Sequence, residues 1–194
     1  MIKTHFNLRK LFSFLPVFLF AQILLAQSID LGQDKENRFR YLEAKAKFGA
    51  FLKNNNSLAE NGLLDNGYGA VTLKYGWQTT EKDEWAKVLG FPSFGVGIYS
   101  GFMSDAEVFG NPNAFFGFVK FPLTNIYSRT ELYLEPSFGL TYNLNAYDKE
   151  KNPLNDAIGA RVAVYFNLNL GATYKWTREL DLLYGLDFTH FSNG

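Results

Sequence analysis

The chain has 194 residues and a formal net charge of zero, with 18% aromatic residues, 20% charged residues and 17 glycines. The balanced charge gives no basic field for nucleic acid, and the absence of cysteine excludes disulfides, thiolate metal sites and cysteine nucleophiles. Only two histidines are present, His5 and His190, which leaves no histidine-rich metal site. We therefore expect no nucleic-acid partner, no metal and no cofactor.

The N-terminus has the form of a secretory signal peptide. Positive residues, among them Lys3 and Arg9, precede an apolar run from residue 11 to residue 25, and Ala26 is a small residue before a polar start. The run is short for a membrane-spanning helix, and Pro16 interrupts it. We expect residues 1–26 to be cleaved as a signal and residues 27–40 to form a polar lead-in without periodicity.

The rest of the chain, residues 41–194, reads as one domain of β-strands. Apolar and polar residues alternate with a period of two, which is typical of strands with two different faces. Gly110-Asn111-Pro112-Asn113 and residues 54–57 are strong turn signals, and residues 81–89 can form one or two helical turns. Seven strand-like runs result: 42–50, 68–78, 94–103, 114–123, 131–144, 162–176 and 180–192.

The two clearest runs, 131–144 and 162–176, indicate an antiparallel outer-membrane β-barrel. One face is apolar throughout, the other is polar but mostly uncharged, and each run reaches the ~9–11 residues that cross a bilayer at a tilt. Bacterial barrels of one chain use an even number of strands, eight or more. Because seven runs are counted, we expect the final strand or strands to be missing, beyond Gly194. A soluble lipocalin-like barrel, with the apolar face inside, remains the alternative.

Two other patterns have simpler explanations than catalysis. Glu131 and Glu135 share the polar face with Tyr133. A carboxylate pair for glycosidase chemistry is conceivable, but a hydrogen-bond network with inward Lys or Arg fits a small lumen better. The glycines Gly95 and Gly97 lie within a strand and open no helix, which argues against a dinucleotide fingerprint.

The last strand carries the candidate site. Its parity places His190 and Ser192 on the apolar face, and Asp181 and Asp187 on the opposite one. A histidine two residues from a serine on the same face can serve as a base toward the hydroxyl. Beyond them, Asn193 offers an amide donor and Gly194 allows close backbone approach. A Ser-Asn-Gly turn after an interfacial histidine explains the same residues without catalysis.

The pentapeptide His190-Phe191-Ser192-Asn193-Gly194 resembles the His-x-Ser-Asn motif of the PagL-type lipid A 3-O-deacylases and of their longer relatives labelled acyloxyacyl hydrolase. Only the pentapeptide is specific, whereas the rest of residues 41–194 is similar as a strand pattern. The resemblance implies that His190 is the general base, Ser192 the nucleophile, and Asn193 a positioning or oxyanion group. It also implies a site that faces the membrane.

The resemblance further implies a glutamate after the motif, and the sequence ends before one. We therefore expect a C-terminally truncated member whose 194-residue chain is inactive or strongly impaired. The expected function is that of a Gram-negative outer-membrane esterase that removes an ester-linked acyl chain at the 3-position of lipid A, within lipopolysaccharide. A non-enzymatic small barrel for adhesion, assembly or permeability is the alternative, and a homodimer is left open.

Overall fold

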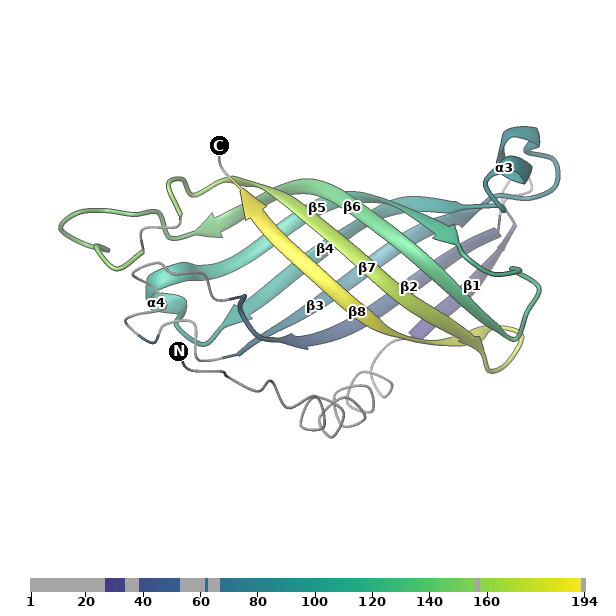
Figure 1. Ribbon diagram of the computed structural model, residues 1–194, viewed down its shortest axis with the longest axis horizontal. Coiled ribbons are helices and arrows are strands. Elements are labelled where there is room, and N and C mark those ends of the chain that lie inside the picture. The colour runs from purple at the N-terminus through teal and green to yellow at the C-terminus, as the bar shows by residue number, and fades with distance from the viewer. Residues whose placement is uncertain (1–26, 34–38, 53–61, 63–66, 156–157, 193–194) are drawn as a thin grey trace, which may run out of the picture.

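The computed structural model describes residues 27–33, 39–52, 62, 67–155 and 158–192, and shows a closed antiparallel barrel (Figure 1). The expected signal peptide, residues 1–26, and the expected turn at residues 54–57 lie outside the described residues. Neighbours in sequence are neighbours in the barrel, and β1 pairs with β8 to close it. The strands are β1 (Gln27–Gln33), β2 (Phe39–Gly49), β3 (Tyr68–Gln78), β4 (Ser93–Met103), β5 (Gly110–Pro122), β6 (Thr130–Leu144), β7 (Ala163–Lys175) and β8 (Leu180–Ser192).

Two short helices interrupt the strand order, α3 (Glu84–Val88) and α4 (Ala106–Phe109). Helix α3 confirms the helical turns expected at residues 81–89. Neither helix, nor any other helical segment in the described part of the chain, is long and apolar enough to cross a membrane. The turn expected at Gly110–Asn113 is wrong, because these residues begin β5 and the register against β6 shifts between Gly110 and Asn113. The glycine and proline signal therefore marks a β-bulge at the strand end.

The segment expected as a polar lead-in contains a strand, β1, which was missed because it shows no alternation. Strand β1 is the eighth strand of the barrel, and it precedes the seven counted runs in the sequence. The even number of strands is therefore reached within the described residues. The closure that it makes is short. Residues 27, 28 and 29 pair with 182, 181 and 180 of β8, whereas β8 pairs with β7 along its whole length.

The apolar faces of the strands point outward. Leu132, Phe138, Leu140, Leu170 and Leu186 are all exposed, and each lies between neighbours that face the lumen. Such an exterior suits lipid, because a membrane solvates apolar side chains that water does not. The lipocalin-like alternative requires the opposite arrangement and is therefore wrong for this chain.

The lumen is filled by a charged network instead of an apolar core. The carboxylate of Glu43 is fully buried and forms ion pairs with three lysines, at 3.2 Å from Lys45 and 2.6 Å from Lys120, with Lys74 as the third. Lys74 also pairs with Glu135 at 2.5 Å. The inward hydrogen-bond network predicted for Glu135 is thus confirmed. The charge of this carboxylate is neutralised by lysine, and Glu135 is not one of a pair of catalytic carboxylates as in a glycosidase.

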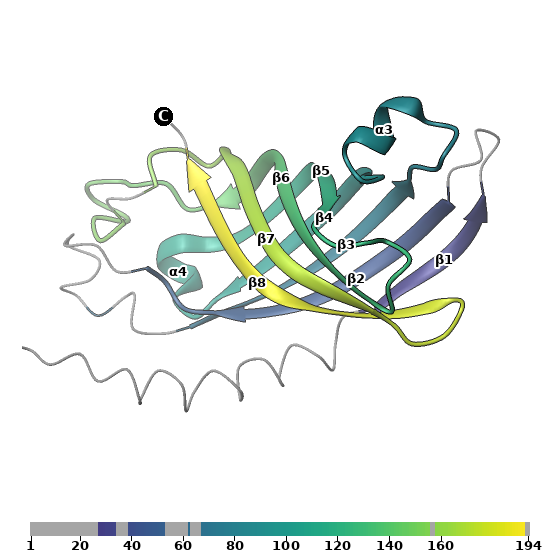
Figure 2. The same cartoon turned by 45° about the vertical axis from the view of Figure 1, so that its right-hand side comes forward.

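The two ends of the barrel differ in their connections (Figures 1 and 2). We call one the turn end: there β2, β4, β6 and β8 begin, and it holds helix α3. At the other, the loop end, β3, β5 and β7 begin, and it holds helix α4. In the sequence, the longest connections between strands, residues 50–67 and 145–162, join strands at the loop end. Strand β8 runs from the turn end to the loop end, so its last residues lie at the loop end (Figure 2).

Candidate functional site on the outer wall

The end of β8 is held in place by a side chain that points into the barrel. The ring of Phe191 lies 6.0 Å from the rings of both Tyr99 and Tyr165, which are buried in the lumen. Because successive side chains of a strand point to opposite faces, this contact turns His190 and Ser192 outward. Both are exposed, and the outward parity expected from the sequence is what the structure shows.

The surroundings of His190 and Ser192 are apolar. His190 is paired with Phe166 of β7, and Ser192 with Val164. On the other side of His190 along β8, the ring of Phe188 lies parallel to the imidazole, with centroids 6.5 Å apart and an interplanar angle of 5°. The imidazole and the hydroxyl therefore sit together in a patch of hydrocarbon on the outer wall.

The strand spacing of His190 and Ser192 is compatible with acyl transfer. Side chains two residues apart on one face of a strand lie ~7 Å apart at their Cα atoms, within which an imidazole and a hydroxyl can meet. Within the described residues the structure records no hydrogen bond between His190 and Ser192. In enzymes without substrate such bonds are often long and tighten only when the substrate binds.

The two upstream acids cannot orient His190. Asp187 lies on the lumen side, where its carboxylate is 2.7 Å from the ammonium of Lys47 and accepts a hydrogen bond from Asn169 at 2.9 Å. Asp181 is at the turn end, paired with Ser28. Strand β7 contains no acidic residue. Neither strand of the described site therefore presents an outward carboxylate to the imidazole, and Asn193 and Gly194 lie outside the described residues.

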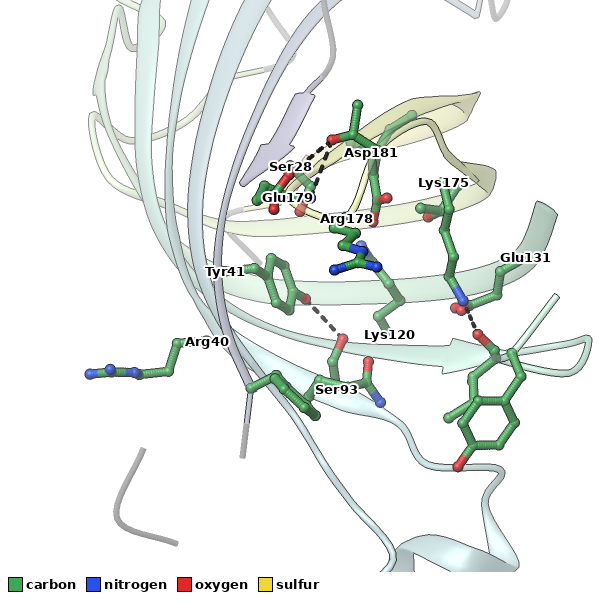
Figure 3. A pocket seen from close by; sticks show the side chains of 17 residues that line it. Ser28, Arg40, Tyr41, Ser93, Lys120, Glu131, Lys175, Arg178, Glu179 and Asp181 are labelled. Carbon is green, nitrogen blue, oxygen red and sulfur yellow. Dashed lines mark hydrogen bonds between the residues drawn. The ribbon is translucent and has the colours of Figure 1, made fainter. Parts of the chain in front are cut away.

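A cavity of about 420 Å³, lined in part by charged side chains, lies elsewhere, inside the barrel at the turn end (Figure 3). The hydroxyl of Tyr41 lies 2.8 Å from Ser93 Oγ, and Lys120, Lys175 and Glu131 also line the cavity. The cavity contains charges of both signs and is separated from His190 by the length of β8. It is therefore not part of the site on the outer wall.

Residues 148–155, near the loop end, are held by side-chain hydrogen bonds. The side chain of Asp148 accepts hydrogen bonds from the backbone N–H groups of Lys151 and Glu150, each at 2.9 Å. These donors hold the pKa of Asp148 below its usual range, since they stabilise the ionised carboxylate. Asn152 and Asn155 both donate to the carbonyl of Val108, at 2.9 Å each, which ties these residues to α4. The described residues contain no group of three or more His, Cys, Asp or Glu arranged to hold a metal ion.

The sequence did not reveal the partners of the inward charges. Lys45 and Lys47 alternate with apolar residues in β2, which signals an inward charged row, but their partners Asn169 and Asp187 lie more than a hundred residues away. Only the register of the closed barrel brings these groups together.

A family model described as "Lipid A 3-O-deacylase (PagL)" matches residues 69–194. Neither the curated proteins nor the solved structures gave a match. The matched region includes all of β3 except its first residue, and all of β4 to β8, and therefore the whole described part of the site.

Proposed function

Because the chain belongs to the PagL family of lipid A 3-O-deacylases, we propose that it hydrolyses the ester of the acyl chain at the 3-position of lipid A, with Ser192 as nucleophile and His190 as general base. The observation that carries the proposal is the exposure of both side chains on the apolar outer wall. A base and a nucleophile placed there meet lipid, not the contents of the lumen.

The proposed reaction has two steps. The Oγ of Ser192 attacks the ester carbonyl while His190 accepts its proton, and the tetrahedral intermediate collapses as the imidazolium returns that proton to the departing sugar oxygen. The acyl group is then bound to Ser192. Water, deprotonated by His190, attacks this second ester, and the fatty acid leaves as Ser192 regains its proton. This sequence of steps requires no cofactor.

The position of the site along the barrel supports lipid A as the substrate. Outer-membrane barrels have short periplasmic turns and longer extracellular loops. By that criterion the loop end, with connections 50–67 and 145–162, faces the outside. His190 and Ser192 then lie beside the outer leaflet, which holds lipid A. The membrane already keeps the acyl chain against the barrel wall, which lowers the entropic cost of bringing the ester to Ser192. Residues 1–26 would direct the protein there as a cleaved signal.

A pair of His190 and Ser192 without an orienting carboxylate should turn over slowly. Serine hydrolases use a carboxylate to hold the histidine in the correct tautomer and to stabilise the imidazolium. Neither β7 nor β8 presents one on the outer face, since Asp187 is paired with Lys47 in the lumen. We assign Asn193 to the stabilisation of the oxyanion on the strength of the family motif, and Gly194 to the same region because glycine allows close backbone approach.

A non-enzymatic barrel is the second candidate function. The filled lumen argues against a role in permeability. Eight-stranded barrels have an interior just wide enough for side chains to fill it. Here the ion pairs of Glu43 and Glu135 with three buried lysines occupy that interior. In such a barrel His190 is an interfacial histidine and Ser192 begins a turn.

The experiment is a mass spectrum of lipid A from cells that express the chain in their outer membrane. We expect a minor species that lacks the 3-linked acyl chain with the wild type, and none with Ser192→Ala. Ser100→Ala is the matched control, because Ser100 also has outward parity but lies on β4. Equal conversion by wild type and Ser192→Ala, or no conversion by the wild type, would refute the proposed function.

A further inference from the structure

We propose that helix α3, at the turn end of the barrel, lies in the periplasmic leaflet of the membrane and inserts its apolar face among the phospholipids. Figures 1 and 2 show the helix projecting from the turn end, clear of the strands. In the sequence, residues 79–92, which contain the helix, form the longest connection between strands at that end. Periplasmic turns of outer-membrane barrels are usually short, so a longer one that contains a helix indicates an added contact.

The helix exposes its largest apolar side chains on one face. Trp85, Val88 and Leu89 are spaced by three and four residues, which makes them neighbours on the surface of a helix. Val88 is 86% exposed, Trp85 51% and Leu89 47%. Ala86, by contrast, is fully buried. The helix therefore turns a small side chain toward the protein and presents three large apolar ones to its surroundings.

The direction of this face is fixed by hydrogen bonds within the connection. The N–H of Phe91 donates to the carbonyl of Ala86 at 2.7 Å, so the chain folds back directly after the helix. The hydroxyl of Thr79 donates to the carbonyl of Pro92, also at 2.7 Å, and this bond joins the two ends of the connection. The exposed apolar face is thus a defined part of the fold.

The wall of the barrel next to the helix already has the side chains that mark a membrane surface. Trp77 and Phe94 are the last outward pair of β3 and β4 before the connection, and their rings are stacked with centroids 5.9 Å apart. Tyr75 packs edge-on against Trp77, with centroids 4.6 Å apart. Such aromatic groups lie at the level of the headgroups in outer-membrane barrels. The connection leaves the wall at this level, which brings helix α3 beside the headgroups.

The charges of the connection suit headgroups that carry phosphate. Lys82 and Lys87 are exposed, and no ion pair is recorded for either among the described residues. Two of the three acids have partners within the protein: Glu81 accepts a hydrogen bond from the hydroxyl of Tyr127 at 3.3 Å, and Asp83 accepts one from a backbone N–H at 3.1 Å. The lysines can therefore reach phosphates while the apolar face enters the boundary between headgroups and acyl chains.

The test is quenching of Trp85 fluorescence by brominated lipid. Trp85 becomes the one tryptophan of the full chain when Trp77 and Trp176 are replaced with phenylalanine. This protein is folded into vesicles of phosphatidylcholine, with or without bromine near the headgroup end of the acyl chains. We expect a blue-shifted emission from Trp85, and a loss in brominated lipid about as large as that of a chain that keeps Trp77 instead.

A tryptophan at position 127, in a chain without the three native ones, is the matched control. Tyr127 is also exposed at the turn end, but it lines the cavity inside the barrel. The Tyr127→Trp chain should emit as in water and escape quenching by bromine. In the chain that keeps Trp85, Val88→Glu should reduce the quenching, because a carboxylate on this face opposes its contact with lipid, whereas Val88→Leu should preserve it.

An emission of Trp85 typical of water, quenched by dissolved acrylamide and not by brominated lipid, would overturn the proposal. Equal quenching in Val88→Glu and Val88→Leu would overturn it as well. A periplasmic protein would then be the partner that fits the apolar face. The readout does not involve His190, Ser192 or hydrolysis, so its outcome is independent of the proposed function.

Discussion

Replacing Glu43 with glutamine should lower the free energy of unfolding by about 3–5 kcal/mol, the usual cost of removing one partner of a buried ion pair. Glu43 is fully buried and pairs with Lys45, Lys74 and Lys120. Without its charge, Glu135 is the one carboxylate among the described residues that still forms an ion pair with Lys74 or Lys120. The measurement is urea unfolding of the barrel in lipid vesicles, followed by tryptophan fluorescence.

Glu131→Gln is the matched control for this prediction. Glu131 lies on the same strand as Glu135 but near the turn end, only partly buried, with no ion pair recorded in the described residues. Its replacement should change the free energy of unfolding by less than about 0.5 kcal/mol. Equal unfolding midpoints for the two variants would show that the charged network does not hold the lumen together.

Replacing Phe188 with glutamate should raise the rate of ester hydrolysis by this chain about tenfold or more. Phe188 flanks His190 on the side away from Ser192, with its ring parallel to the imidazole at 6.5 Å. A carboxylate there can accept a hydrogen bond from one imidazole nitrogen while the other faces Ser192. Loss of the orienting acid costs about 10⁴-fold in a serine protease, so an imperfect replacement should recover a measurable part.

The control for Phe188→Glu is Leu186→Glu, which places the same charge on the same outward face but two residues further from His190. Both variants bear the cost of a carboxylate on the lipid side of the wall, so any destabilisation is shared. The assay is the release of free fatty acid from lipid A by the purified proteins in micelles. Hydrolysis by Phe188→Glu no faster than by Leu186→Glu would show that a missing carboxylate does not limit His190.

The strands that could be predicted from sequence are those with one clear apolar face. Strand β3 has the bounds expected, Tyr68–Gln78, because alternation is unbroken along it. The outward direction of His190 and Ser192 was predictable for the same reason: β8 stays in register with β7 from Lys175–Asp181 to Val164–Ser192, without a bulge to invert the parity.

What escaped prediction depends on pairing across the barrel. Strand β1 is short and polar, so it is recognisable as a strand only through its partners on β2 and β8. Counting alternating runs therefore gave seven strands. The ion pair of Lys47 with Asp187 depends on which residues of different strands stand side by side, and a period of two carries no such information.

The central claim is that Ser192 is an activated nucleophile on the lipid-facing wall, and a covalent probe tests it most directly. The purified chain in micelles is treated with a long-chain alkyl fluorophosphonate, and the modified peptide is located by mass spectrometry. The account predicts slow modification of the peptide that holds Ser192, faster in Phe188→Glu and absent in both Ser192→Ala and His190→Ala. Modification of another residue, or the same modification in Ser192→Ala, would contradict it.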